Sequence, residues 1–191
     1  DPLIEGCYAL GHRQGVADDL GPALDAWIAP AFRTLPALFG ERDGILVSAA
    51  CRLSDVGARL HPDHRADLVF EQVLRAPIAG QTHPERAFLA AAAFARHATA
   101  FNPPELAVLE RLLSPPRLKR ARALGAGIRL GCDLSGRSAP LLNHSRLTID
   151  KGDLLLTADP GYADLLLGEQ TAKRAGTLAN LLGLKLKITA L

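Results

Sequence analysis

The sequence predicts a mainly α-helical protein that ends in a small α/β unit. Apolar residues recur at helical spacing through most of residues 1–136, and proline or glycine separates each apolar stripe from the next. From about residue 145 the pattern changes to short extended runs on either side of Lys151-Gly152. We therefore expect a helical domain over residues 1–136 and a small α/β (β-β-α-β) subdomain over residues 137–191.

Length and composition describe a globular chain. The 191 residues, of which 48% are apolar, are enough to bury a core, and no apolar run is long enough to span a bilayer. The three cysteines are odd in number and have no CxxC spacing, so we expect reduced, buried thiols in a cytoplasmic protein.

Two helices are expected in the first 40 residues. Asp1-Pro2 is a typical helix start and Gly15 a typical stop, so the first helix should run through about Gln14. Asp18 or Asp19 caps the second helix, which Pro30 should kink or end.

Three further helices follow in residues 44–99. Apolar residues from Ile45 to Leu60 form one helical stripe, and Pro62 breaks it. A second helix buries residues 68–74. The third opens at His83-Pro84-Glu85, where proline and a carboxylate both favour the first turn.

Two more helices, over residues 105–113 and 116–134, complete the helical domain near Gly136. Beyond it, residues 145–150 and 153–158 form a predicted hairpin because Gly152 accepts a positive φ. Residues 160–183 read as helix, which Gly168 can break, and residues 184–191 as a last strand. We expect the subdomain's own helix on one sheet face and the helical domain on the other.

Charge is distributed unevenly along the chain. Residues 1–100 hold nine arginines, no lysine and twelve acidic residues, whereas residues 101–191 hold thirteen basic and eight acidic residues. The second half is therefore the candidate anion-binding surface. Its densest basic run, residues 117–122, lies opposite an apolar helix stripe; it is either an anion site or an ordinary solvated face.

Two sequence segments carry a family resemblance. SAACRLSDVGARLHPDHRAD, followed by HPERAFLAAAAFARHA, resembles the C-terminal region of the exopolyphosphatase / guanosine-pentaphosphate phosphohydrolase family. The resemblance implies an HD-like helical fold preceded by an actin-like phosphatase module. That module would use Mg²⁺ to remove terminal phosphate from polyphosphate or guanosine pentaphosphate. The chain begins at Asp1, lacks methionine and shows no Gly-rich phosphate loops, so we interpret it as an excised, non-catalytic C-terminal portion.

The resemblance also bears on metal binding. HD phosphohydrolases hold metal through an early His, a His-Asp pair and a later Asp; the similar positions here are Leu20 and Ser54-Asp55. With both imidazoles replaced, we expect no metal, no other cofactor and no catalytic residue in this chain. A rearranged metal-dependent HD site remains an alternative. Against it, His83 and His97 stand fourteen residues apart on one predicted helix, about 21 Å by helical rise.

Arginine residues are stronger candidates for a functional site than a metal cluster, because the planar donor fork of arginine suits phosphate oxygens. The predicted polyanion-binding residues are Arg59, His61, His64, Arg65, Arg86, Arg96, Arg117, Lys119, Arg120 and Arg122. The simpler interpretation of those between residues 59 and 96 is pairing with nearby acids.

The partners implied are inorganic polyphosphate, the chain's own N-terminal actin-like module and a second copy in a homodimer, with no membrane and no specific nucleic acid. A pure dimerisation or interaction module with no anion role is a further alternative.

Overall fold

The computed structural model describes all residues from Asp1 to Leu191, and it is mainly α-helical with a small sheet near the C-terminus, as predicted. The elements in chain order are α1 (Pro2–Arg13), α2 (Leu20–Phe32), α3 (Arg42–Arg52), α4 (Pro62–Arg75), α5 (His83–His97), α6 (Leu106–Leu112), α7 (Pro115–Ser135), α8 (Ala139–Leu142), β1 (Ser145–Asp150), β2 (Asp153–Ala158), α9 (Ala163–Leu166), α10 (Glu169–Leu182) and β3 (Lys185–Ala190).

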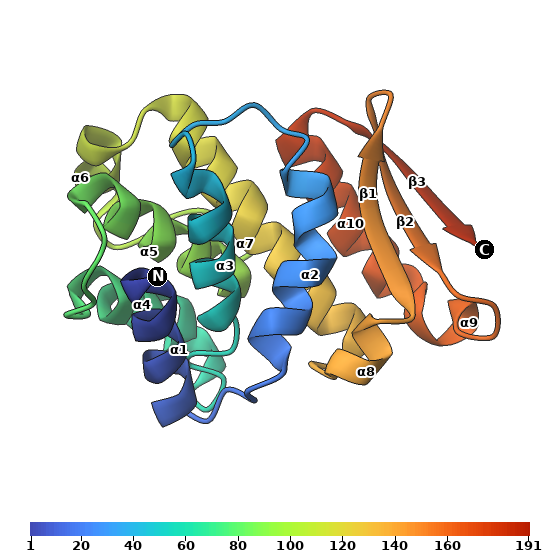
Figure 1. Ribbon diagram of the computed structural model, residues 1–191, viewed down its shortest axis with the longest axis horizontal. Helices are drawn as coiled ribbons and strands as arrows, with labels where there is room; N and C mark the ends of the chain where they lie inside the picture. The colour runs from blue at the N-terminus through green and yellow to red at the C-terminus, as the bar shows by residue number, and fades with distance from the viewer.

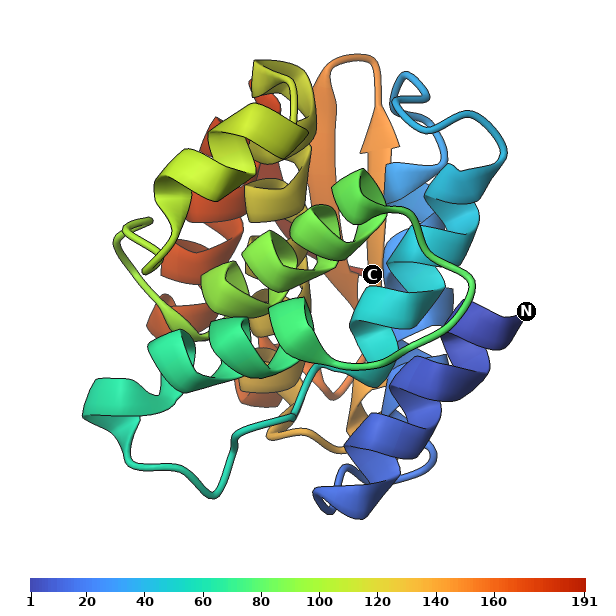
Figure 2. The ribbon, with the colours of Figure 1, turned by 90° about the vertical axis from the view of Figure 1, so that its left-hand side faces the viewer.

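The long helix α7 runs through the middle of the molecule (Figure 1). The helices α1 and α3 to α6 lie on one side of it, and α10 with the three strands lies on the other. Figure 2, turned by 90°, shows α4 and α5 side by side on the face away from the sheet. Helix α5 is the most buried element, since every residue from Ala87 to Arg96 is buried.

Small residues bring α5 and α7 into close contact. A Cβ atom added to Gly125 would lie 2.4 Å from the Ala92 carbonyl oxygen and 2.6 Å from the Ala95 Cβ. Only glycine therefore fits at this crossing. The close approach places the end of α5, with Arg96, beside the C-terminal half of α7, with Arg129.

Helix starts follow the sequence signals closely. Asp1 caps α1 by accepting a hydrogen bond from the Leu3 amide at 2.8 Å. Helix α5 begins at His83 as predicted; Thr82 and Glu85 form a reciprocal capping box there. In α2, Pro30 lies inside the last turn, and the helix ends two residues later at Phe32.

One helix is much shorter than predicted. The stripe from Ile45 to Leu60 predicted a single helix, but α3 ends at Arg52 and turns occupy residues 53–60. Gly57 has a φ of +84°, and a Cβ there would lie 2.2 Å from the Val69 Cγ2 atom. The apolar residues Leu53 and Val56 are buried in this turn segment, so their spacing resembled that of a helix.

The sheet has the order β1-β2-β3, with β1 and β2 antiparallel and β2 and β3 parallel. The hairpin turn is the predicted one: Lys151 and Gly152 have φ values of 48° and 83°, as a type I′ turn requires. Helices α9 and α10 connect β2 to β3, with Gly168 between them and Gly183 ending α10 in the left-handed conformation.

The expectation that both sheet faces are covered is wrong. Leu147, Leu154 and Leu156 are buried on one face, which packs against the helices. On this side Trp27 of α2 donates a buried hydrogen bond of 3.0 Å to the Ser145 hydroxyl. The opposite face carries exposed Arg146 and Lys187. Alternation in β1 and β3 leaves this polar face to solvent.

One hydrophobic core of 47 buried residues runs from α1 to α10 through both predicted domains. The division at residues 136/137 stays a prediction. The cysteines Cys7, Cys51 and Cys132 are unpaired and buried, as predicted. None of the helices combines the length and the apolar character needed to cross a membrane.

Candidate anion-binding site

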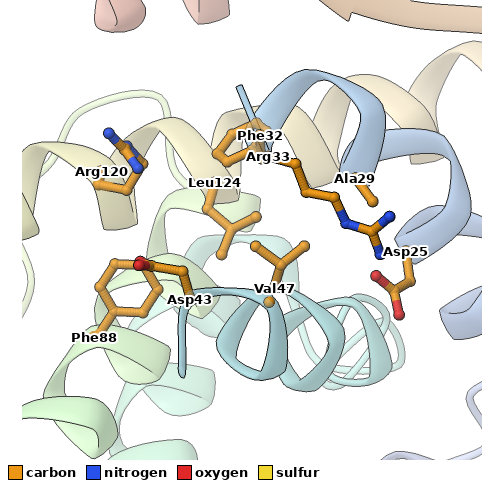
Figure 3. A pocket seen from close by; sticks show the side chains of 10 residues that line it. Asp25, Ala29, Phe32, Arg33, Asp43, Val47, Phe88, Arg120 and Leu124 are labelled. Carbon is orange, nitrogen blue, oxygen red and sulfur yellow. The ribbon is translucent and has the colours of Figure 1, made fainter. Parts of the chain in front are cut away.

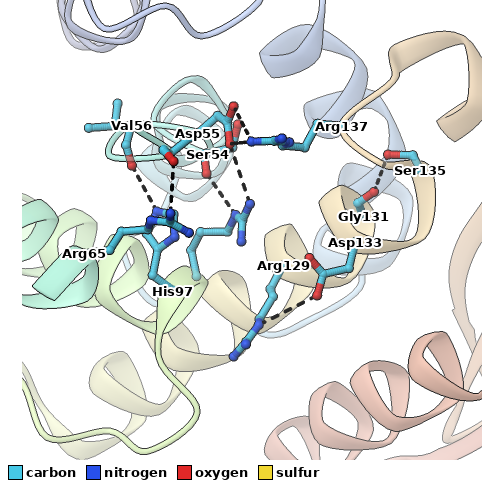
Figure 4. Close-up of polar contacts among 12 residues, drawn as sticks. Ser54, Asp55, Val56, Arg65, His97, Arg129, Gly131, Asp133, Ser135 and Arg137 are labelled. Carbon is cyan, nitrogen blue, oxygen red and sulfur yellow. Dashed lines mark hydrogen bonds and ion pairs between the residues drawn. The ribbon is translucent and has the colours of Figure 1, made fainter. Parts of the chain in front are cut away.

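Five arginines converge around one polar cleft, which we call the arginine pocket. It has a volume of about 660 Å³ and lies where α4, α5, α7 and α10 meet. Its charged lining residues are Arg65, Arg96, Arg129, Arg137, Arg174, Asp55 and Asp133. Because five guanidinium groups face only two carboxylates, the pocket is strongly positive, and Figure 4 shows most of these groups.

Backbone carbonyl groups hold two of the arginines. Arg65, in the first turn of α4, donates through Nη2 to the carbonyls of Ala58 and Leu60 at 3.0 and 2.9 Å. Arg96, in the last turn of α5, donates through Nε to the Ser54 carbonyl at 2.9 Å. Both therefore depend on the turn segment 53–60. Carbonyl oxygens orient these side chains without neutralising them.

Arg129 and Arg174 face each other from α7 and α10. Arg174 donates to Asp133 at 3.0 Å, whereas Arg129 lies 3.9 Å from the same carboxylate and makes no hydrogen bond. Burial lowers the pKa of Arg129, and the positive charges of Arg174 and Arg96 lower it further. This mutual repulsion is what a bound anion would relieve.

Arg137 reaches the pocket from the turn after α7. Gly136 ends the helix with a φ of +58°, and Arg137 follows with a φ of +62°, which is uncommon for a residue other than glycine. The Arg137 amide donates back to the Cys132 carbonyl at 2.9 Å, which fixes the turn. Its guanidinium group lies 3.4 Å from Asp55.

His97 is a neutral member of the pocket. Its Nε2 atom lies 3.0 Å from the Val56 carbonyl oxygen (Figure 4). Burial lowers the pKa of His97 to about 3, and the charges of Arg96, Arg65 and Arg129 act in the same direction. Because a carbonyl oxygen only accepts, the single ring proton must sit on Nε2.

The positions that resemble an HD metal site do not fit a cation. Leu20 and Ser54 are both buried, and the Ser54 hydroxyl has no hydrogen-bond partner. Asp55 faces the guanidinium groups of Arg96 at 3.8 Å and Arg137 at 3.4 Å. No three side chains of His, Cys, Asp or Glu are grouped to hold a metal ion. The charge of this lining suits an anion better than a cation.

Only two of the predicted residues, Arg65 and Arg96, line the arginine pocket. His61 and His64 are exposed, and His61 caps α4 by accepting from the Asp63 amide at 3.3 Å. Arg59 is exposed, with its guanidinium group over Gly15.

The alternative of pairing with nearby acids accounts for only one of these arginines. Of the four predicted arginines in this range, at positions 59, 65, 86 and 96, Arg96 alone has a carboxylate within 4 Å. Arg86 donates to the Leu74 carbonyl at 3.4 Å, and its Nε atom is buried without a partner.

The basic run at the start of α7 does not form a single surface. Arg117 donates to the Leu38 carbonyl at 2.7 Å and covers the Phe39 ring. Arg120 donates to the Pro36 carbonyl at 3.1 Å and borders a small hollow of about 50 Å³, shown in Figure 3. Arg122 lies over the Phe101 ring, and Lys119 is exposed.

The prediction missed three of the five pocket arginines. Arg129 lies two turns beyond the basic run, Arg137 follows the helix stop at Gly136, and Arg174 belongs to α10. Arg129 shares the polar side of the predicted helix with the basic run, but Arg137 and Arg174 have no local sequence signal, and only the packing of α10 on α7 brings the three together. The one available hint was the basic surplus of residues 101–191.

The chain is a mainly α-helical fold with a small three-stranded sheet, and its polar cleft is lined by five arginines and two aspartates. The model of the family described as "Exopolyphosphatase, C-terminal" matches residues 27–189. The chain therefore belongs to this family. The resemblance noted in the sequence is thereby confirmed. None of the curated proteins compared with the chain matches it.

Proposed function

We propose that this chain is the non-catalytic, polyanion-holding portion of an exopolyphosphatase-like phosphohydrolase, and that inorganic polyphosphate binds in the arginine pocket. The observation that supports this most is the surplus of five arginines over two aspartates in one cleft. The family assignment supports phosphate chemistry in the parent protein. Hydrolysis of the terminal phosphate would take place in an actin-like module with Mg²⁺, outside this chain.

The pocket suits a chain of phosphates for a physical reason. Each phosphate unit presents oxygens that a guanidinium fork contacts two at a time. Arg129, which has no hydrogen bond of its own, and Arg137, whose contacts to Asp55 are 3.4 Å or longer, have donors available. Contacts distant from the reacting phosphorus raise affinity and keep the substrate bound between cleavages without taking part in the reaction.

The test is direct binding of long-chain polyphosphate to the purified chain at low salt. We expect Arg129→Gln combined with Arg137→Gln to weaken binding by tenfold or more, because each charged contact contributes about 1 kcal/mol or more. The matched control is Arg111→Gln combined with Lys119→Gln, which removes two exposed charges outside the pocket. The absence of binding at low salt, or equal affinity of both double variants, would contradict the proposal.

A second comparison separates the pocket from the originally predicted basic helix. Changing Arg117, Arg120 and Arg122 together to Ala removes three basic side chains of that run and leaves the pocket arginines in place. If this triple variant loses binding and the pocket variant does not, the polyanion binds at the start of α7 instead.

Homodimer formation and attachment to an actin-like module belong to the same proposal, and the family assignment is their support. Measuring the molecular mass of the purified chain in solution tests homodimer formation. Phosphate release from polyphosphate, measured for the chain with and without its native N-terminal extension, tests attachment to an actin-like module. The chain alone should release no phosphate. A stable dimer that does not bind polyphosphate would favour the alternative of a pure interaction module.

A further inference from the structure

Strand β3 forms an open edge of the sheet. In the order β1-β2-β3 it pairs only with β2, and Figure 1 shows it at the rim of the molecule with no other element beyond it. At the other edge, α2 lies beside β1. An edge strand with unpaired backbone groups is a template on which a further strand can form. The edge of β3 is therefore a candidate interaction surface.

The hydrogen bonds to β2 occupy alternate residues of β3. The amides of Lys185 and Leu191 donate to carbonyl groups at or next to the ends of β2, at 3.2 and 2.9 Å. Because a strand in a parallel pair directs its amide and carbonyl groups to either side in turn, those of Leu186, Ile188 and Ala190 point to the open edge. The register to β2 continues through the whole strand without a bulge, and the strand has no proline. Nothing interrupts this row of donors and acceptors.

The side chains of β3 are divided between the two faces of the sheet. Lys185, Lys187 and Thr189 are exposed on the polar face. Leu186 and Ile188 are half-buried against the core, so each has apolar surface left to cover. A strand added at this edge places its own side chains on the same two faces, directly opposite those of β3. A complementary strand therefore alternates acidic residues with apolar ones.

The charges favour an acidic partner over a second copy of this chain. β3 contains two lysines and no acidic residue. Lys185 has no carboxylate within 4 Å, whereas Lys187 pairs with Asp153 of the neighbouring strand. Opposite charges across a strand pair are stabilising and like charges are destabilising. The β3 strand of a second copy would bring two more lysines to the same edge, and edge lysines discourage pairing of this kind.

We propose that the open edge of β3 binds an extended acidic segment of a partner protein, which joins the sheet as an antiparallel fourth strand. Backbone hydrogen bonds to Leu186, Ile188 and Ala190 hold the segment, and its acidic side chains lie opposite Lys185 and Lys187. The antiparallel direction is chosen because antiparallel pairs are the more stable per residue. No residue of the sheet lines the arginine pocket, so this inference is independent of the proposed function.

The test measures binding of a fluorescent peptide, about as long as β3, in which valine alternates with glutamate. Fluorescence anisotropy with the purified chain at low salt reports the binding. We expect this glutamate peptide to bind. The matched lysine peptide, in which lysine replaces every glutamate, should not bind. Equal affinity of the two peptides would overturn the proposed acidic preference.

Methylated peptides distinguish strand addition from simple charge attraction. In an antiparallel fourth strand the valines lie opposite Leu186 and Ile188 and turn their amides toward β3, whereas the glutamates turn their amides to solvent. N-methylation of the valine amides should therefore abolish binding, and N-methylation of the glutamate amides should leave it unchanged. If methylation of the glutamate amides has the larger effect, or if both have equal effects, the proposal is overturned.

A charge reversal on β3 tests the specificity of this edge. Lys185→Glu should weaken binding of the glutamate peptide by about fivefold, because a repulsion replaces a cross-strand attraction. The same variant should bind the lysine peptide, a gain that a misfolded chain would not show. Lys119→Glu makes the same change of charge at an exposed position on α7 and should alter neither binding. Equal effects of the two variants would contradict the proposal.

A proline on β3 tests the backbone contacts directly. Ile188→Pro removes an amide that points to the open edge and leaves the hydrogen bonds to β2 in place. It should abolish binding of the glutamate peptide, with urea unfolding as the check that the variant is folded. Peptide binding by the folded variant overturns the proposal. So does a natural chain that is dimeric and becomes monomeric with Ile188→Pro, because a second copy then occupies the edge. Neither outcome changes polyphosphate binding, which tests the proposed function separately.

Discussion

At the scale of single residues, His97 links the pocket to the stability of the fold. Its pKa is lowered from 6.5 to about 3 by burial and by the neighbouring arginines. Below pH 6.5, His97 is therefore protonated in the unfolded chain but stays neutral in the folded chain until the pH approaches 3. The stability contribution is fully present above pH 6.5 and is lost as the pH falls toward 3, by up to about 1.4 kcal/mol per pH unit.

The variant His97→Gln should lack this pH dependence, since the Gln amide can still donate to the Val56 carbonyl but does not titrate. The measurement is the free energy of unfolding in urea from pH 7.5 to 4.5 for both chains. The lowered pKa of Glu85 contributes equally to both, so the difference between the curves isolates His97. Parallel curves would show that His97 titrates normally in the fold.

Arg137 combines an unfavourable backbone conformation with a place in the pocket. At a φ of +62° a side chain costs about 1–2 kcal/mol that glycine avoids. We expect Arg137→Gly to be about 1 kcal/mol more stable than Arg137→Ala, although both lose the same guanidinium group and bind polyphosphate equally weakly. Urea unfolding and binding of the two variants test this. Equal stabilities would mean that the turn relaxes.

At the scale of elements, the crossing of α5 and α7 determines where Arg96 and Arg129 lie. Gly125→Ala would place a methyl group 2.4 Å from the Ala92 carbonyl, and we expect a loss of about 1–3 kcal/mol in stability together with weaker polyphosphate binding. Gly176→Ala, in α10 with nothing within 4 Å, should instead stabilise by about 0.5–1 kcal/mol. Thermal unfolding of both variants is the measurement. If both stabilise the protein, the helices have room to separate.

The elements also show what local sequence can and cannot predict. The starts of α1 and α5 were predictable because capping and proline signals act within a few residues. The end of α3 was not, because the turn at Gly57 depends on close contact with Val69, a residue twelve positions later. Likewise, hydrophobic periodicity did not predict that only one face of the sheet is covered, because this depends on where α2 packs.

At the scale of the whole molecule, the candidate site is a product of tertiary packing. Arg65 and Arg96 were predictable because they punctuate an apolar region, whereas Arg129, Arg137 and Arg174 come together only when α10 packs on α7. Conversely, Arg117 and Arg120 form a dense basic run in the sequence, but their guanidinium groups bond the carbonyls of Leu38 and Pro36. Charge density along the chain and charge density in space therefore differ here.

This difference leads to a prediction about salt. By the counterion-release argument made for nucleic acids, the logarithm of the polyphosphate affinity should fall linearly with the logarithm of salt concentration. The pocket has three more positive than negative side chains, so we expect a slope of about −2 to −3. Arg129→Gln should reduce the slope by about one, and Lys119→Gln should leave it unchanged. The slope is measured by binding titrations at salt concentrations that span about a tenfold range, from roughly 20 to 300 mM. A slope that responds to Lys119 and not to Arg129 would place the polyanion at the basic run near the start of α7 and not in the arginine pocket.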